Sequence, residues 1–396
     1  MSEEATAMRP WRFVIWFGTV SLLADFVYEG ARSVTGPLLA SLGASAALIG
    51  VVTGAGEAAA LLLRLGSGPL ADRSGRFWGW AIAGYALTVA SVPALGATGV
   101  LWIACALVIA ERVGKAVRAP AKDTLLSHAT AATGRGRGFA VHEAMDQVGA
   151  LIGPLTVAGM LALTGDDYGP ALGILALPGI AVLALLFRLR RQVPDPAAYE
   201  RAVTRDAERQ EPGARLPRAF WVYASFTAAT MAGFATFGVL SFHIVARGLL
   251  PTAAVPLLYA AAMAVDALAA LATGWAYDRV GPRVLIVLPL LSAAVPALAF
   301  TDSLAPVVLG SLLWGAATGV QESTLRATVA DLVAPGRRAT AYGVFAAFVG
   351  AAAFAGGALT GVLYDVSIPV LIAVVAAIQA AAVVLLAVSG GMRRRA

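Results

Sequence analysis

The sequence is poor in charge, cysteine and histidine. Only 13% of its 396 residues are charged, and it has one cysteine and three histidines. The lone Cys105 cannot form an intrachain disulfide, so the fold does not depend on oxidation. The scattered histidines follow no metal-ligand spacing, and no G-x-x-x-x-G-K-[ST] loop is present to hold the phosphates of ATP. We therefore expect neither an enzyme nor an ATP-driven pump, and no bound cofactor.

Long apolar runs take the place of charge. Hydrophobic residues make up 59% of the chain, and the mean hydropathy is +0.79, which lies outside the range of soluble globular proteins. A membrane-spanning helix needs about 20 mostly apolar residues. Twelve segments meet that need: 13–39, 46–66, 78–95, 100–119, 138–163, 171–189, 220–245, 254–276, 284–300, 306–329, 341–363 and 369–388. The sequence therefore predicts an all-α membrane protein with 12 transmembrane helices.

One short charged segment occurs twice. The stretch 68–76 reads GPLADRSGR, and a degraded copy begins at Gly274. The matched pairs lie 206 residues apart: Gly68 and Gly274, Asp72 and Asp278, Arg73 and Arg279, Gly75 and Gly281. An internal repeat of that size in an apolar chain indicates a transporter built from two homologous halves. We interpret each copy as a turn between two spans.

The first copy resembles the signature loop G-x-x-x-D-R-x-G-R of the major facilitator superfamily, which joins the second and third helices of each half. The resemblance implies two pseudo-symmetric six-helix bundles and a secondary active transporter that works by alternating access. With the charged, proline-containing segment between the apolar halves, it predicts three parts: residues 1–191, a cytoplasmic linker 192–217, and residues 218–396. In the outward-open state we expect Asp72 and Arg73 to hold the inner helix ends together, with Arg76 paired to neighbouring acids.

Lysine and arginine gather on one side of the predicted spans. With the amino terminus inside, the inner segments all carry arginine, whereas the outer segments offer only Arg247. This pattern predicts a multi-pass protein of the cytoplasmic (inner) membrane with both termini in the cytoplasm. The net charge of +6 follows from that topology, and no basic patch with interleaved aromatics indicates a nucleic-acid partner. The expected partners are a small-molecule substrate, protons and lipid, and we expect a monomer.

Ionisable residues inside the predicted spans mark the candidate site. Each costs roughly 3 kcal/mol at the bilayer centre unless it is paired or hydrated, so each needs an explanation. The proposed coupling and substrate residues come from the first, second and fourth spans: Asp25, Tyr28, Glu29, Arg32, Glu57, Glu111 and Arg112. A carboxylate near the midplane can load and release a proton as access alternates, and Arg112 can compete with that proton. Asp25 is the first choice for the proton carrier, Glu29 the second and Glu57 the third.

The same charges do not recur in the second half. At the offset of 206, Arg112, Lys115 and Arg118 meet Thr318, Gln321 and Thr324. The second half has a sparser set of its own, Asp266, Glu322 and Arg326. Because a scaffold role would not require charges in one half alone, the asymmetry favours a functional cluster.

Two further predictions concern the fourth and fifth spans. Lys115 and Arg118 should form a bridging layer of the inner gate with Glu143 and Asp146, since these four residues fall at similar depth. Separately, Gly149, Gly153 and Pro154 resemble the G-x-x-x-G-P core of the antiporter motif of exporters in this superfamily. The glycines would let another helix approach closely, and the proline would kink the span.

The predicted function is proton-coupled efflux of a small organic molecule or drug. One alternative is a carrier or flippase of an amphipathic anion such as a lysolipid, whose head group would meet Arg112, Lys115 and Arg118. A lower alternative is a divalent-metal exporter that uses Asp25, Glu29 and Glu57. Intact signature segments argue against a sensor on a transporter fold. Drug exporters tend to have Arg followed three residues later by Gln-Gly, whereas Arg112 is followed by Lys115-Ala116, so drug specificity does not transfer.

Overall fold

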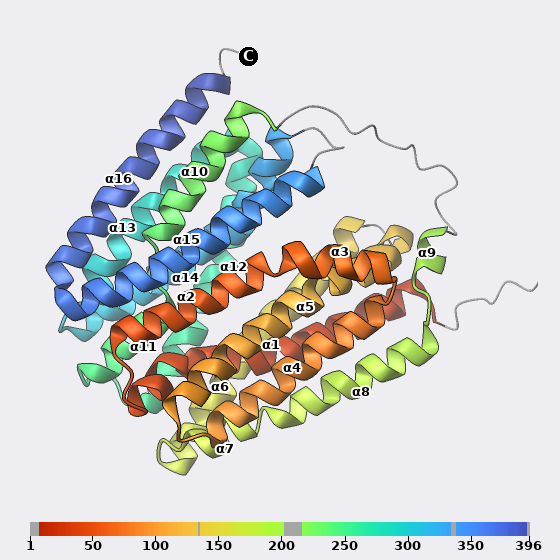
Figure 1. Cartoon of the computed structure of the whole chain (residues 1–396), viewed down its shortest axis with the longest axis horizontal. Coiled ribbons are helices and arrows are strands. Elements are labelled where there is room, and N and C mark those ends of the chain that lie inside the picture. The colour runs from red at the N-terminus through yellow and green to blue at the C-terminus, as the bar shows by residue number, and fades with distance from the viewer. Residues whose placement is uncertain (1–7, 134, 202–215, 334–337, 394–396) are drawn as a thin grey trace, which may run out of the picture. The chain divides into compact units, whose positions relative to one another are not determined.

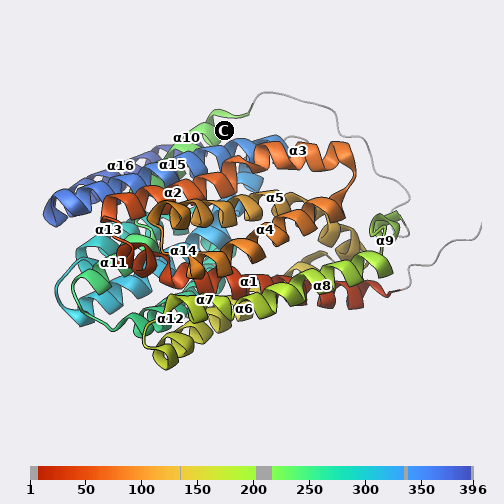
Figure 2. The ribbon, with the colours of Figure 1, turned by 60° about the horizontal axis from the view of Figure 1, so that its bottom comes forward.

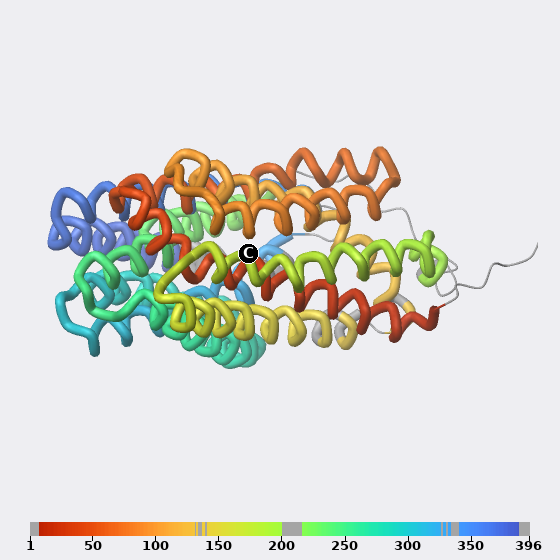
Figure 3. The backbone as a smooth tube through the Cα atoms, turned by 90° about the horizontal axis from the view of Figure 1, so that it is seen from below, coloured from red at the N-terminus to blue at the C-terminus, as the bar shows by residue number. Residues whose placement is uncertain are grey.

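The computed structural model of this protein describes residues 8–133, 135–201, 216–333 and 338–393, and these contain helices and no strand (Figure 1). The first half of the chain contains α1 (Pro10–Ser41), α2 (Ala46–Leu62), α3 (Arg64–Ser74), α4 (Phe77–Ala97), α5 (Leu101–Thr133), α6 (Arg135–Thr164), α7 (Tyr168–Gly173), α8 (Ala176–Gln192) and α9 (Ala197–Arg201). The second half contains α10 (Arg218–Ala232), α11 (Phe237–Ala246), η1 (Thr252–Ala254), α12 (Val255–Val280), η2 (Gly281–Ile286), α13 (Val287–Ala299), α14 (Leu304–Leu332), α15 (Arg338–Val366) and α16 (Ile368–Arg393). The tube in Figure 3 shows how short most connections between consecutive helices are.

The all-α membrane class is confirmed. Over the described residues, 10 helical stretches are long and apolar enough to cross a membrane. One of them, Thr252–Ala299, contains both α12 and α13, while α5 falls outside the ten because charged residues interrupt it. Counting α12 and α13 separately and including α5 gives the twelve predicted spans.

The described residues pack into two compact units. Unit 1 draws on Met1–Ala31, Leu63–Thr98 and Ala110–Arg209, and unit 2 on Arg32–Leu62, Gly99–Ile109 and Gln210–Ala396. These units differ from the halves predicted by the repeat, because α2 and the end of α1 pack on helices of the second half. The boundaries 1–191, 192–217 and 218–396 therefore stay a prediction, and residues 202–215 of the linker lie outside the described part of the chain.

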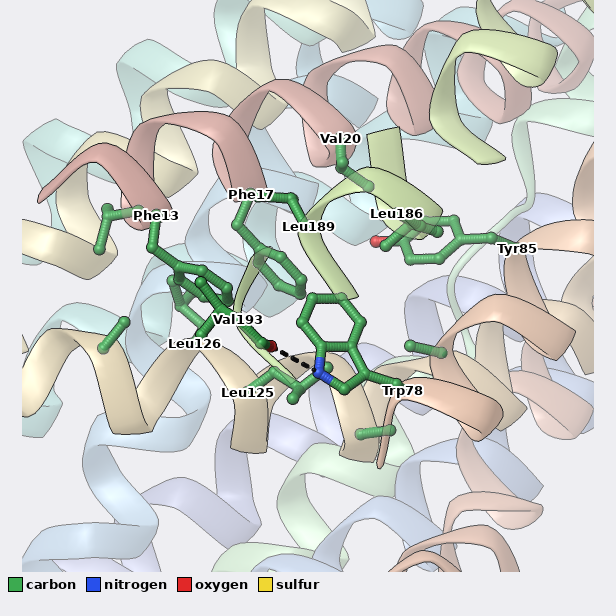
Figure 4. Close-up of a cluster of buried hydrophobic side chains, with 14 of the residues drawn as sticks. Phe13, Phe17, Val20, Trp78, Tyr85, Leu125, Leu126, Leu186, Leu189 and Val193 are labelled. Atoms are coloured by element: carbon green, nitrogen blue, oxygen red, sulfur yellow. Dashed lines mark hydrogen bonds between the residues drawn. The ribbon is translucent and has the colours of Figure 1, made fainter. Parts of the chain in front are cut away.

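Unit 1 has an apolar core where α1, α4, α5 and α8 meet. Phe13 and Phe17 of α1 stack with ring centroids 5.4 Å apart, and both meet the edge of Trp78 at 6.2 Å (Figure 4). The indole nitrogen of Trp78 donates a hydrogen bond of 3.2 Å to the carbonyl of Val193, just beyond α8. Buried aromatic rings with satisfied polar atoms thus anchor α1, which carries the candidate site further along.

Unit 2 is built on close packing of small residues. The helices α2 and α15 lie side by side in Figures 1 and 2, and a side chain at Gly50 would collide with the carbonyl oxygen of Gly357. A side chain at Gly361 would likewise meet Ala46. Glycines at the contact let the two backbones approach, as in membrane helix pairs generally. Asp365 at the end of α15 accepts the N–H of Ala47 at 2.9 Å, which caps the first turn of α2.

The repeated charged segments are helical rather than turns. Residues up to Ser74 belong to α3, and residues up to Val280 belong to α12. Only the glycines end the helices: Gly75 has φ 61° and Gly281 has φ 66°, a backbone region that favours glycine. The prediction of turns at these segments was wrong because their Asp, Arg and Ser residues tolerate a helix, and the glycine alone determines where it stops.

The predicted span 220–245 is interrupted. α10 ends at Ala232 and α11 begins at Phe237, so the four residues between them are not helical. Side chains of two other helices satisfy carbonyls at the break, since Gln379 donates to Thr230 at 2.9 Å and Trp314 donates to Ala235 at 2.9 Å. A continuous helix was therefore a wrong prediction, because these side-chain donors replace the lost helical hydrogen bonds.

Candidate functional site

Tyr28 is the centre of a cluster of cations in unit 1. It lies in α1 and is 7% exposed, and three bases of α5 face its ring. The distances to the ring centroid are 4.4 Å for the Lys115 nitrogen, 5.5 Å for the Arg118 guanidinium and 5.8 Å for that of Arg112. Lys115 also donates to the phenol oxygen at 3.3 Å. Each cation–π contact stabilises by about 0.5–2 kcal/mol, more when water is excluded, so the ring helps to hold positive charge here.

Arg112 and Glu111 form a buried pair on α5. Both residues are 7% exposed, and the Arg112 Nε lies 3.3 Å from the Glu111 Oε2. The second carboxylate oxygen of Glu111 is buried and has no hydrogen-bond partner among the described residues. Glu111 therefore holds Arg112 locally, and the competition between Arg112 and a proton for a carboxylate stays a prediction.

Arg118 is held by neutral groups. It is 4% exposed, its Nη1 donates to the Thr88 hydroxyl at 2.6 Å, and its guanidinium lies 4.8 Å from the Tyr85 ring centroid. No ion pair involves Arg118 among the described residues. The contact arises because α4 and α5 approach closely at Gly84 and Gly114, where added side chains would lie 2.6–2.8 Å from atoms of the other helix.

Asp146 of α6 binds a base that the predicted inner gate did not include. Its Oδ2 lies 3.6 Å from the Lys122 nitrogen and 3.4 Å from the His142 Nδ1. Lys122 donates to the Ser21 hydroxyl at 3.3 Å, so α1, α5 and α6 meet at this group. The predicted bridging layer of Lys115 and Arg118 with Glu143 and Asp146 is wrong in its pairing. Arg118 turns to α4, Lys115 meets Tyr28, and Glu143 is exposed.

Asp25 lies between these two groups. Its carboxylate is partly buried and forms no ion pair among the described residues. The charges that act on it most strongly are those of Asp146, Lys122, Lys115 and Glu29, and Glu29 itself is only 5% exposed. Two aspartates thus share the field of two lysines, an arrangement that can hold or give up one proton with little rearrangement.

The glycine motif of α6 sets the distance between Asp25 and Asp146. A side chain at Gly149 would collide with the carbonyl oxygen of Leu22, and one at Gly153 with that of Phe26. A Cβ at Gly149 would also lie 3.1 Å from the Cβ of Asp25. The small residues therefore seat α6 directly on the turn of α1 that carries the carboxylate, and Pro154 follows within α6.

The predicted coupling residues are divided between the two units. Arg32 and Glu57 belong to unit 2, where the Arg32 Nη2 lies 2.9 Å from the Glu57 Oε1. Their side chains are 26% and 28% exposed, so this pair is partly hydrated. Glu57 is thereby occupied by a base, whereas Asp25 remains close to cations without a fixed bond.

The remaining predicted residues take separate places. Asp72, Arg73 and Arg76 are exposed, Gly68 is half-buried, and none of the three charged residues forms an ion pair among the described residues. Asp266 is 3% exposed in α12 and lies against Gly319 of α14, while Glu322 is exposed. The side chain of Arg326 lies outside the described residues. Over the described chain, no group of three His, Cys, Asp or Glu residues is arranged to hold a metal.

Sequence reasoning missed Lys122 and His142. Lys122 stands seven residues after Lys115, which puts both bases on one face of α5. His142 and Asp146 are four residues apart in α6 and therefore neighbours on its surface. These spacings were present in the sequence and could have identified the group.

Comparison with known proteins agrees with this arrangement of helices. A family model described as Major Facilitator Superfamily matches residues 19–265 and 249–394. The chain belongs to the major facilitator superfamily. It is similar to Rv2265 of Mycobacterium tuberculosis, with 66% identity over 96% of this chain and 93% of that one. It is also similar to the MFS-type transporter MJ1317 of Methanocaldococcus jannaschii, with 22% identity over 89% of each chain.

Solved structures with the same fold are transporters. A peptide transporter POT in complex with sulfate has a TM-score of 0.75 at 15% identity, over 97% of this chain and 94% of that one. The nucleoside transporter NupG has a TM-score of 0.70 at 14% identity, over 96% and 98%. A bacterial homologue of the lysosomal transporter Spinster, inward-facing and occupied, has a TM-score of 0.68 at 16% identity, over 97% and 96%. These likenesses show the same fold, and the family match over residues 19–265 and 249–394 shows that the chain is a multi-pass membrane transporter.

Proposed function

We propose that this protein is a proton-coupled secondary transporter that exports a small organic molecule by alternating access. The observation that supports the proposal is the group formed by Asp25, Asp146, Lys115 and Lys122 in unit 1. We further propose that it works as a monomer in the cytoplasmic membrane, with both termini in the cytoplasm and the proton gradient as its energy source.

Asp25 is the proton carrier in this mechanism. Asp146 is tied to Lys122 and His142, whereas Asp25 has no fixed ion-pair partner among the described residues. A proton on Asp25 removes one negative charge and leaves Lys115 and Lys122 to Asp146 and Tyr28. Loss of that proton restores the attraction between α1 and α5, so protonation and helix position are linked.

The direction of transport is supported by the glycine motif. Gly149, Gly153 and Pro154 resemble the antiporter motif of exporters, and in this chain the two glycines seat α6 on α1 beside Asp25. In an antiporter the substrate and the proton exclude each other. Because α6 and α1 are in backbone contact, a substrate that shifts one of them changes the surroundings of Asp25 directly.

Proton movement in inverted membrane vesicles tests this function with a panel of candidate substrates. Vesicles acidified by respiration and loaded with an acridine dye would receive organic cations, nucleosides, dipeptides and lysophospholipids in turn. A substrate should release protons and restore fluorescence. Asp25→Asn should abolish the response, whereas Glu143→Gln, which removes an exposed carboxylate of α6, should retain it. A full response from Asp25→Asn would refute the assignment.

The carrier of an amphipathic anion is the second candidate. Arg118 supports it, because this buried cation has Thr88 and two tyrosine rings around it and no ion pair among the described residues. An anionic head group could complete its coordination. In the same vesicles, a lysophospholipid should compete with the substrate in the parent protein and should no longer compete in Arg118→Gln. That result would favour this candidate over export of an uncharged or cationic compound.

A further inference from the structure

His243 is completely buried near the end of α11, and both of its ring nitrogens are engaged. Nε2 lies 2.9 Å from the carbonyl oxygen of Thr301, and Nδ1 lies 2.8 Å from the hydroxyl of Tyr364. A carbonyl oxygen only accepts, so Nε2 carries the hydrogen. In the neutral ring Nδ1 therefore accepts from the Tyr364 hydroxyl. The imidazole thus joins α11 to the connection after α13 and to α15.

The charges around the His243 ring disfavour a second cation beside Arg247. The charge of Arg247 acts on both His243 and Tyr364, and the Arg247 Nη1 lies 3.4 Å from the Asp302 Oδ1. Asp302 is 76% exposed, so water and salt screen its attraction. Asp365 is adjacent to Tyr364 but accepts the N–H of Ala47 on α2.

A proton on Nδ1 would break this arrangement. The phenol hydrogen that now points at Nδ1 would lose its acceptor and would have to turn away from the ring. A second positive charge would then lie close to that of Arg247, with only the exposed Asp302 to compensate. The contact as it stands requires a neutral His243.

The element that His243 holds is a separate half-helix. The break between Ala232 and Phe237 isolates α11 from α10, and side chains of α14 and α16 satisfy the carbonyls there, so the break is built into the fold. α11 also covers helices of the first half: a side chain at Gly36 of α1 would collide with Ser241, and the hydroxyls of Thr53 and Thr236 are 3.0 Å apart. Release of its far end would uncover these contacts.

We propose that His243 is a proton-binding site whose occupation releases α11 from Tyr364 and Thr301. In the proposed orientation, with both termini in the cytoplasm, this end of α11 and the neighbouring Arg247 lie outside, so the site senses the external proton concentration. The proposal does not depend on Asp25 or on the direction of transport. It makes opening of the outer half-helix respond to acid below about pH 6.5, the ordinary pKa of histidine.

Accessibility of a cysteine at the covered face tests the proposal. The reporter is Ser241→Cys in a Cys105→Ser chain, labelled with a maleimide in purified full-length protein. Thiol reactivity itself falls by about tenfold per pH unit in this range, so each rate is divided by that of the same cysteine in unfolded protein. This ratio should rise in the parent as the pH falls from about 7.5 to about 5.5, by at most about tenfold per pH unit for one proton.

Two variants and one control decide the outcome. His243→Gln keeps a donor for Thr301 but cannot gain a proton, so labelling should stay slow at every pH. Tyr364→Phe removes the partner of Nδ1 and should give fast labelling already at neutral pH. His128→Gln removes a histidine of α5 and should leave the pH response unchanged. A parent without a pH response, or a response that persists in His243→Gln, would overturn the proposal, and neither result would bear on transport driven through Asp25.

Discussion

Gly153 offers the sharpest quantitative test of how α6 is seated on α1. A Cβ at this position would collide with the carbonyl oxygen of Phe26 and lie 3.0 Å from the nitrogen of Gly30. Both contacts are with backbone, which cannot rotate away as a side chain would. Gly159 lies in the same helix, is exposed, and would place its Cβ in open space. Gly153→Ala and Gly159→Ala therefore make the same chemical change in opposite surroundings.

The expected difference follows from two opposing effects. Alanine in place of glycine favours a helix by about 1 kcal/mol, and this gain is common to both variants. Overpacking at a tight contact costs about 1–3 kcal/mol, and only Gly153→Ala incurs it. The shared gain cancels in the comparison, so Gly153→Ala should be less stable than Gly159→Ala by about 1–3 kcal/mol. Gly159→Ala should equal or exceed the parent.

Thermal unfolding in one detergent, followed by the loss of monodisperse protein on size exclusion, gives the order of stability. Because such unfolding is often irreversible, all three proteins must be heated at the same rate. Equal stability of the two variants, or a less stable Gly159→Ala, would refute the close contact between α6 and α1. That result would also refute the argument that the glycine motif positions Asp25.

Three further predictions concern single contacts. Gly75→Ala should destabilise by about 1–2 kcal/mol because Gly75 has φ 61°, whereas Gly99→Ala, in open space, should not; thermal unfolding compares them. Lys122→Met should destabilise more than the double variant Lys122→Met with Asp146→Asn, because the single change leaves a carboxylate uncompensated, and a double-mutant cycle measures this coupling. Asp365→Ala should cost about 1 kcal/mol by uncapping α2, and hydrogen exchange should rise in the first turn of α2 and not in α6. Equal exchange in α2 of parent and variant would contradict the cap.

The helices could be predicted from composition, but their interruptions could not. Apolar length fixes where a chain can cross the membrane, and α12 to α16 begin and end within a few residues of the predicted ranges, except that α16 continues to Arg393. The break before Phe237 depends on donors from Gln379 and Trp314, which are far away in sequence. No sequence pattern near Gly233 indicates that Gln379 and Trp314 will supply these hydrogen bonds. A single glycine in an apolar run is compatible with a continuous helix.

The candidate residues could be identified from sequence, but their partners could not. The free-energy cost of a charge in the membrane shows that each buried ionisable residue needs a partner. The depth of a residue along its helix limits which residues of other helices can be that partner. Depth does not say in which direction a side chain points around the helix. Arg118 turns toward Thr88 because Gly84 and Gly114 bring α4 close on that side. Lys122, seven residues after Lys115, is thus the base that meets Asp146.

The asymmetry between the two halves has a structural counterpart. The second-half equivalents of Arg112 and Arg118 are Thr318 and Thr324, and both hydroxyls donate to carbonyls one turn back within α14. They therefore need no partner from another helix and contribute no charge. The main polar feature of the second half is instead the interrupted α10–α11 segment, which has His243 near its C-terminal end. We propose that a proton at Asp25 changes the attraction between packed helices of unit 1, whereas a proton at His243 frees one half-helix in unit 2. In these proposals the two copies of the repeat respond to protons differently, because the first carries buried charges and the second carries an interrupted helix.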